Sequence, residues 1–67
     1  MLASERRFAE VKKLLERAGY QLVRVHGSHH YFVKPGRPPL SIPVHQGKVK
    51  PYYVRQAEKA CQDEQGP

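Results

Sequence analysis

Residues 20–47 have the sequence YQLVRVHGSHHYFVKPGRPPLSIPVHQG, which carries the clearest strand and turn signals of the chain. Three short runs in it are rich in β-branched and aromatic residues, and they predict strands over 20–25, 29–34 and 40–45. Gly27-Ser28 and Gln46-Gly47 are turn signals, and the proline-rich stretch 35–39 is expected to form a loop. Pro43 has no N–H to give to a neighbouring strand, so the third strand is restricted to a sheet edge. We therefore expect a three-stranded antiparallel meander.

Amphipathic segments flank this region on both sides. Apolar residues recur before it at helical spacing, namely Phe8, Val11, Leu14, Leu15 and Ala18. Ser4 is a suitable N-cap and Gly19 a left-handed stop, so a helix is predicted over 4–18. Pro51 suits the first turn of a closing helix, because its missing N–H is not needed there. That helix has an apolar stripe of Tyr53, Val54, Ala57, Ala60 and Cys61. The tail 62–67 is expected to fray.

The order of these elements predicts an α+β fold with the sequence α-β-β-β-α. Short connections favour pairing between consecutive strands, and both helices are expected to cover one face of the three-stranded antiparallel sheet. The other sheet face is then open to solvent or to a ligand. No linker, repeat or low-complexity segment divides the chain, so residues 1–67 are expected to form a single domain with a core of about 4–61.

Length and composition narrow the class of protein. A chain of 67 residues buries only about 60% of the surface that its unfolded form exposes, which excludes a large multi-layer enzyme. Hydrophobic residues make up 39%, charged residues 27%, and the mean hydropathy is −0.73, as in a soluble globular domain without a membrane span. Residues 1–7 lack the apolar core of a secretory signal, so we expect a cytoplasmic protein. Cys61 is the single cysteine, so neither an internal disulfide nor a four-thiolate zinc site is possible.

The charge is distributed unevenly along the chain. The net charge is +6, yet residues 17–57 alone carry seven Lys and Arg and no Asp or Glu. The same segment contains all four histidines and five of the six aromatic residues. Cations mixed with stacking rings suit a phosphate backbone with unpaired bases. A solvated basic surface or a docking patch for an acidic protein would give the same pattern.

The histidines at positions 26, 29, 30 and 45 allow three interpretations. They can be exposed residues with no shared role. A metal site is disfavoured, because adjacent His29 and His30 point to opposite faces of a strand and the surroundings are positive. The third interpretation is acid–base cleavage of RNA, whose 2′-hydroxyl is a built-in nucleophile and needs only a base, an acid and nearby cations. Gly27-Ser28 can serve as the turn alone, or its N–H groups can also hold a phosphate.

Three elements of the chain together resemble the HicA family of toxin ribonucleases. They are LLERAGYQLVR at 14–24, GSHHYF at 27–32 and IPVH at 42–45, and the resemblance covers nearly the whole chain. It implies a double-stranded-RNA-binding-domain-like fold and an endoribonuclease that cuts mRNA without a metal or other cofactor, silenced by a HicB-type antitoxin. The family's catalytic histidine corresponds to His29. Residues 51–54, Pro-Tyr-Tyr-Val, depart from the Pro-Gly-Thr-Leu of many members, so the helix start and the RNA preference are expected to differ from theirs.

The leading hypothesis is thus a metal-independent endoribonuclease with His29 as general acid or base. RNA contacts are expected from Gly27, Ser28, Arg24, Lys34, Lys48 and His45. His45 can instead be structural or contact the antitoxin, and His30 is expected to be a strand residue. Two alternatives stay open: an RNA-binding module without chemistry, and a basic module that docks an acidic protein. No membrane contact and no small-molecule cofactor are expected.

Overall fold

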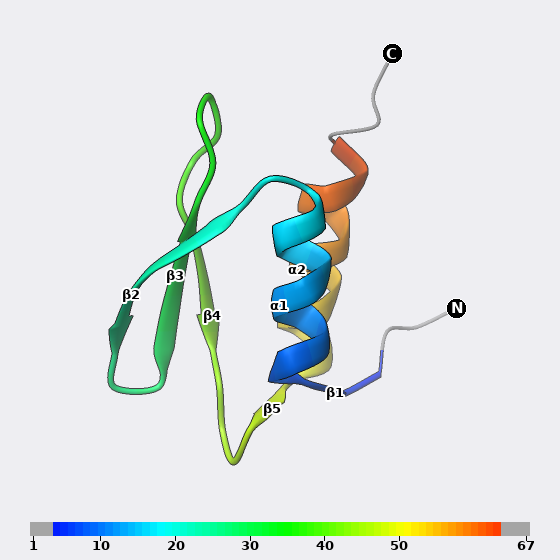
Figure 1. Cartoon of the computed structure of the whole chain (residues 1–67). Coiled ribbons are helices and arrows are strands. Elements are labelled where there is room, and N and C mark those ends of the chain that lie inside the picture. Colours follow the sequence, from blue (N-terminus) through cyan, green and yellow to red (C-terminus); the bar gives the residue numbers. More distant parts are fainter. Residues whose placement is uncertain (1–3, 64–67) are drawn as a thin grey trace.

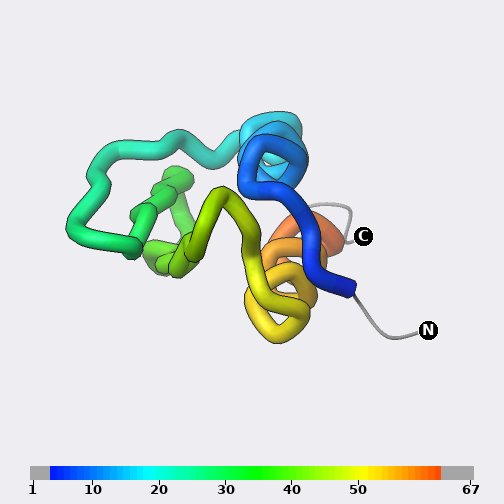
Figure 2. Tube along the Cα trace, turned by 90° about the horizontal axis from the view of Figure 1, so that it is seen from below, coloured from blue at the N-terminus to red at the C-terminus, as the bar shows by residue number. Residues whose placement is uncertain are grey.

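The computed structural model describes residues 4–63 and shows a helical layer packed on one face of a small sheet (Figures 1 and 2). The elements in chain order are β1 (Arg6–Arg7), α1 (Phe8–Arg17), β2 (Gln21–His26), β3 (His29–Val33), β4 (Leu40–Pro43), β5 (Lys48–Val49) and α2 (Pro51–Asp63). The predicted α+β class, with two helices and a three-stranded antiparallel sheet, is confirmed. The short strands β1 and β5 are additional to the prediction.

The main sheet has the strand order β2-β3-β4, and both pairings are antiparallel. Its hairpin turn is Gly27-Ser28, and the positive φ of +62° at Gly27 is the conformation that a two-residue turn starting with glycine requires. A bulge interrupts the register of β2 between Leu22 and Arg24. Because β4 is an edge strand, Pro43 leaves no ladder hydrogen bond unmade, as its position in the sequence predicts.

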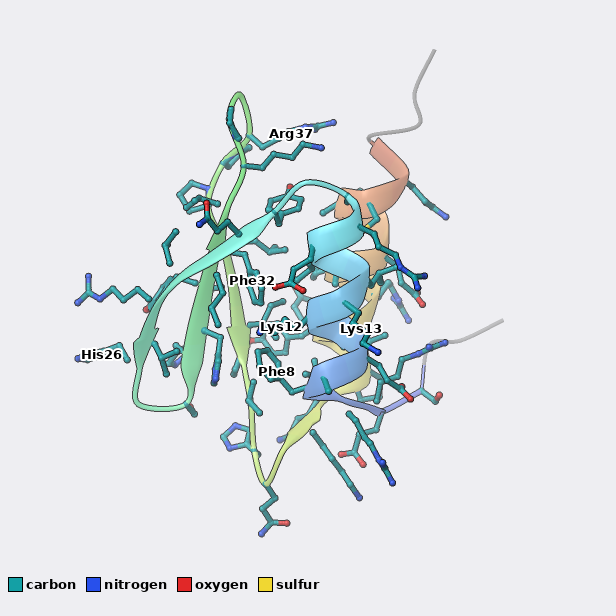
Figure 3. All side chains as sticks on the ribbon, in the orientation of Figure 1. Phe8, Lys12, Lys13, His26, Phe32 and Arg37 are labelled. Atoms are coloured by element: carbon teal, nitrogen blue, oxygen red, sulfur yellow. The ribbon has the colours of Figure 1, made fainter. Side chains whose placement is uncertain are left out.

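The core lies between this sheet and the two helices. Its buried residues are Val11, Leu15, Tyr20, Phe32, Ile42, Val49, Val54 and Ala57. Phe32 and Ile42 come from β3 and β4 and are completely buried. Figure 3 shows Phe8 and Phe32 between the sheet and α1, and their ring centroids are 6.2 Å apart. Strand alternation therefore turns the neighbours of Phe32 and Ile42, Tyr31 and Ser41, to the outer face, which neither helix covers.

The start of α1 differs from the prediction. The helix begins at Phe8, four residues after the expected Ser4, because Arg6 and Arg7 are extended and pair with β5. Arg7, with φ −68° and ψ 141°, occupies the N-cap position without a side-chain cap, so the predicted cap at Ser4 is wrong. The N–H of Phe8 donates to the carbonyl of Gly47 at 2.8 Å, which joins the helix start to the hairpin before β5.

The ends of both helices can be compared with the sequence. Gly19 has φ +100° directly after the last turn of α1, as predicted for a left-handed stop. Helix α2 starts at Pro51 as expected and runs through Asp63, so Gln62 and Asp63 are helical rather than frayed. The remaining part of the expected tail, 64–67, lies outside the described residues. Neither described helix has the length and apolarity that crossing a bilayer would require.

Candidate functional site

His29 is an exposed residue at the first position of β3, directly after the hairpin turn. Its backbone lies between His26 of β2 and Pro43 of β4. Its Nδ1 is 3.4 Å from the hydroxyl oxygen of Ser41, which is a long and therefore weak hydrogen bond. Ser41 thus restrains one ring nitrogen and leaves Nε2 as the nitrogen for another partner. An imidazole has one nitrogen that can accept a proton and one that can donate it, which suits acid–base chemistry.

The turn that presents His29 is anchored from two sides. The carbonyl of Ser28 accepts from the N–H of Val44 at 2.7 Å and from Nδ1 of His30 at 3.1 Å. Because a carbonyl only accepts, Nδ1 of His30 must carry the hydrogen. The ring of His30 also packs on Phe8, with centroids 4.4 Å apart. His30 is thus a strand residue facing the helices, as predicted, and it fixes the backbone next to His29.

His29 borders a surface hollow of about 300 Å³. The hollow is lined by Ser28, His29, Pro43, His45, Lys50 and Tyr53. His45 reaches it because Gln46 and Gly47 form a tight turn with φ of 53° and 75°, so that the backbones of His45 and Lys48 exchange two hydrogen bonds of 2.9 Å. Two histidines far apart in the sequence therefore share one cavity.

Lys50 adds a cation to this hollow and directly precedes α2. Its carbonyl accepts from the N–H groups of Tyr53 and Val54, both at 3.0 Å. The positive end of the 13-residue helix therefore lies beside the Lys50 side chain. A helix N-terminus and an ammonium both favour an anion, so the electrostatics of this hollow suit a phosphate.

Lys50 and Tyr53 were not among the residues expected at the site. The sequence did contain a sign that Lys50 would lie near the site. A two-residue turn at 46–47 pairs His45 with Lys48, and the same register, continued by two residues, places Lys50 beside Pro43. Pro43 in turn pairs with His29. Tyr53 had no comparable signal, since its spacing fits the apolar stripe of α2 and it is half-buried there.

The other expected contacts are distributed around the hollow. Ser28 and His45 line it, and Gly27 forms the adjoining turn. Arg24 lies on the outer sheet face, with its guanidinium carbon 6.0 Å from the centroid of Tyr31.

Two expected lysines have partners elsewhere. The ammonium of Lys48 is 4.0 Å from a carboxylate oxygen of Glu5. Lys34 donates to the carbonyl of Ala18 at the end of α1, and its ammonium lies 5.8 Å from the ring centroid of Tyr20. Neither of them lines the hollow.

The three-dimensional charge pattern separates the sheet from the acidic groups. Between residues 4 and 62 the acids are Glu5, before β1, and Glu10, Glu16 and Glu58 on the helices. Glu58 lies 4.0 Å from Arg6 and Glu16 lies 3.8 Å from Lys12. Among the described residues, the sheet and the hollow consequently carry Lys, Arg and His side chains but no Asp or Glu. Within the described part of the chain, no three His, Cys, Asp or Glu side chains gather where they could hold a metal ion.

A second hollow of about 290 Å³ lies between the proline-rich loop and α2. Its charged lining residues are Arg37 and Lys59, and it includes Tyr20 but no histidine. It can attract an anion, but it offers no imidazole to move a proton. The hollow beside His29 is therefore the better candidate for chemistry.

Comparison with protein families identifies the family to which the chain is similar. A family model described as the HicA toxin of bacterial toxin–antitoxin systems matches residues 8–62. The match begins with α1 and ends within α2, so it contains the whole sheet and the hollow. No match was found among curated proteins.

Proposed function

The chain belongs to the HicA toxin family of bacterial toxin–antitoxin systems, and we propose that it is a metal-independent endoribonuclease that cleaves mRNA. His29 is the general acid or base. The observation that carries this proposal is the hollow that His29, His45 and Lys50 line together beside the start of α2. Family membership supplies the toxin class, and the residues of the hollow supply the reaction.

The proposed reaction uses the nucleophile that RNA already carries. A base takes the proton of the 2′-hydroxyl while its oxygen forms a bond to the adjacent phosphorus. The bond from phosphorus to the 5′-oxygen of the next nucleotide breaks, and an acid protonates that oxygen. The products are a 2′,3′-cyclic phosphate and a 5′-hydroxyl. Cations are needed because negative charge develops on the phosphoryl oxygens in the transition state.

The lining of the hollow provides a group for each of these tasks. One imidazole of the pair His29 and His45 accepts a proton and the other donates one, and Nε2 of His29 is left for this by the contact between Nδ1 and Ser41. Lys50 and the start of α2 stabilise the charge on the phosphate. The acid-free surroundings attract RNA through its backbone in a salt-dependent manner.

The same surface explains how such a nuclease would be controlled. Toxins of this family are paired with an antitoxin, and we propose a HicB-type protein that covers the hollow and the basic sheet face in the cytoplasm. An acidic surface would complement the absence of Asp and Glu from residues 17–57. Covering His29 would prevent RNA from reaching the imidazole.

The direct test is digestion of a long RNA by purified protein in excess chelator, with His29→Ala beside the wild type. We expect cleavage by the wild type and a loss of at least about 100-fold in His29→Ala, since general acid–base catalysis contributes roughly 10²–10⁴-fold. His26→Ala is the matched control. His26 is likewise an exposed histidine of the sheet and is the cross-strand partner of His29, but it does not line the hollow.

Each outcome of this digestion separates the candidate functions. Equal cleavage by the wild type and His29→Ala would remove His29 from the mechanism, and cleavage abolished by chelator would indicate a metal. Salt-sensitive binding that leaves RNA intact would favour an RNA-binding module without chemistry. Growth arrest on expression, relieved by His29→Ala but not by His26→Ala, would support a toxin that acts through this imidazole.

A further inference from the structure

We propose that the outer face of the sheet binds one unpaired nucleobase, stacked on Tyr31 and flanked by Arg24, beside the phosphate at which His29 acts as general acid or base. This inference rests on the proposed ribonuclease function and specifies its substrate as a single-stranded segment. It assigns to Tyr31 a specificity role that the chemistry of the hollow does not require.

The outer face presents Tyr31 between two groups that favour stacking. Tyr31 lies opposite Arg24 on β2, and the guanidinium carbon is 6.0 Å from the ring centroid. On its own strand, Tyr31 stands two residues from His29, so both rings point outward. Their centroids are 6.3 Å apart and the ring planes differ by 28°. An aromatic ring, a guanidinium group and an imidazole therefore lie next to one another on this face.

This surface is continuous with the hollow through a single residue. His29 stacks near Tyr31 and also lines the hollow with Lys50. Ser41, which contacts Nδ1 of His29, is the cross-strand partner of Tyr31. An RNA strand with one phosphate at His29 thus has a neighbouring base within reach of the Tyr31 ring.

The chemistry of the surface favours a base over a protein side chain. Every nucleobase has a flat π-face, and aromatic or guanidinium groups on a sheet bind such faces once the base is unpaired. No acidic residue lies on the sheet to repel the backbone. In a duplex the faces of the bases are already stacked, so paired RNA cannot use Tyr31.

The test measures binding without requiring cleavage. The probe is a short uridine oligomer with all 2′-hydroxyls methylated and one central 2-aminopurine, whose fluorescence falls when it stacks on an aromatic ring. It is titrated with the wild type, Tyr31→Phe, Tyr31→Leu and Tyr31→Ala. Gln21→Ala is the control, because Gln21 is exposed on the sheet and pairs with Val33, two residues beyond Tyr31.

We expect the wild type to bind the probe and quench its fluorescence. Tyr31→Phe and Gln21→Ala should quench it as well and bind with the affinity of the wild type. Tyr31→Leu and Tyr31→Ala should bind about 5- to 150-fold more weakly and give no quenching, as expected for the loss of one stacked base. Leucine keeps apolar volume in this position, so the Leu and Phe variants decide the question even if Tyr31→Ala does not fold. Wild-type-like affinity and quenching in Tyr31→Leu would overturn the stacking proposal.

Arg24 provides a separate readout. If its guanidinium contacts the backbone as well as the ring, Arg24→Gln should lower the slope of log affinity against log salt concentration by about 0.7, while Tyr31→Leu leaves that slope unchanged. Absence of quenching with the wild type would reject the base subsite and leave this face to a protein partner. Quenching by a wild type that never cuts ordinary RNA would instead reject the nuclease and retain the subsite.

Discussion

Replacing Lys50 with glutamine tests whether the cation in the hollow acts on the reacting phosphate. Lys50 lines the cavity that contains His29 and His45. Lys48, two residues earlier, lies outside that cavity with its ammonium 4.0 Å from Glu5. The two substitutions remove the same charge from almost the same place in the sequence. A difference between them therefore reports position rather than net charge.

The size of the effect follows from Coulomb's law. Two unit charges about 4 Å apart interact by about 1 kcal/mol in water and by about 4 kcal/mol at an effective dielectric constant of about 20. These limits correspond to losses of about 5-fold and about 10³-fold in rate. The hollow beside His29 is open to solvent, so we expect Lys50→Gln to lower kcat/KM by about 10- to 100-fold. Lys48→Gln should change it by less than about 3-fold, because exposed charges at longer range are screened.

The assay is the initial rate of cleavage of a fluorogenic RNA at two salt concentrations. Circular dichroism and the thermal midpoint check that both variants fold, as expected because an exposed ion pair such as Lys48 with Glu5 contributes only about 0–1 kcal/mol. Equal losses in the two variants, both disappearing at high salt, would show that Lys50 only steers RNA. That result would refute its assignment to the transition state.

Three further predictions concern the scaffold that holds the site. Phe32→Ala removes a fully buried ring and should lower the free energy of unfolding by about 3–5 kcal/mol. The whole free energy of unfolding of a domain of this size is about 3–10 kcal/mol. Urea unfolding measures the loss, and a urea midpoint near that of the wild type would contradict the prediction. Gly27→Ala should lower the free energy of unfolding by about 1–2 kcal/mol, because alanine is strained at the φ of +62° while its Cβ meets open space. An unchanged thermal midpoint would count against this backbone strain. His30→Ala should lower the unfolding free energy by at least about 1 kcal/mol by losing its bond to Ser28 and its contact with Phe8. His30→Phe should recover only the packing part, and full recovery would deny the hydrogen bond any role.

The secondary structure was largely predictable because its signals are local. The apolar spacing through Leu15 and the glycine after Ala18 predicted the body and end of α1, and both are observed. Alternation around Ile42, together with the edge position required by Pro43, predicted β4. In each case the residues that determine the element lie within a few positions of one another.

The start of α1 could not be predicted in this way. Ser4 has the preferred chemistry of an N-cap, but residues 6–7 pair with residues 48–49, more than forty positions away. That pairing keeps Arg7 extended and moves the first helical residue to Phe8. A local capping preference of about 1 kcal/mol was outweighed by a tertiary contact.

The candidate site was predictable only in part. His29 was identified through the resemblance of Gly-Ser-His to the HicA family's motif, and it is exposed beside a hollow. The sequence did not indicate that Tyr53 would face it, because a tyrosine on an apolar helix stripe is normally a packing residue. It also gave no sign that Lys34 would reach back to the carbonyl of Ala18.

The order of the two helices and the three main strands, and the separation of charge, follow from the amino-acid sequence. Both depend on which residues are neighbours along the chain, including the acid-free segment 17–57. Which groups surround His29 depends instead on the packing of distant segments. The turn at 46–47 and the start of α2 bring His45 and Lys50 to β3, and such convergence depends on register and packing between distant segments, which local propensities do not contain.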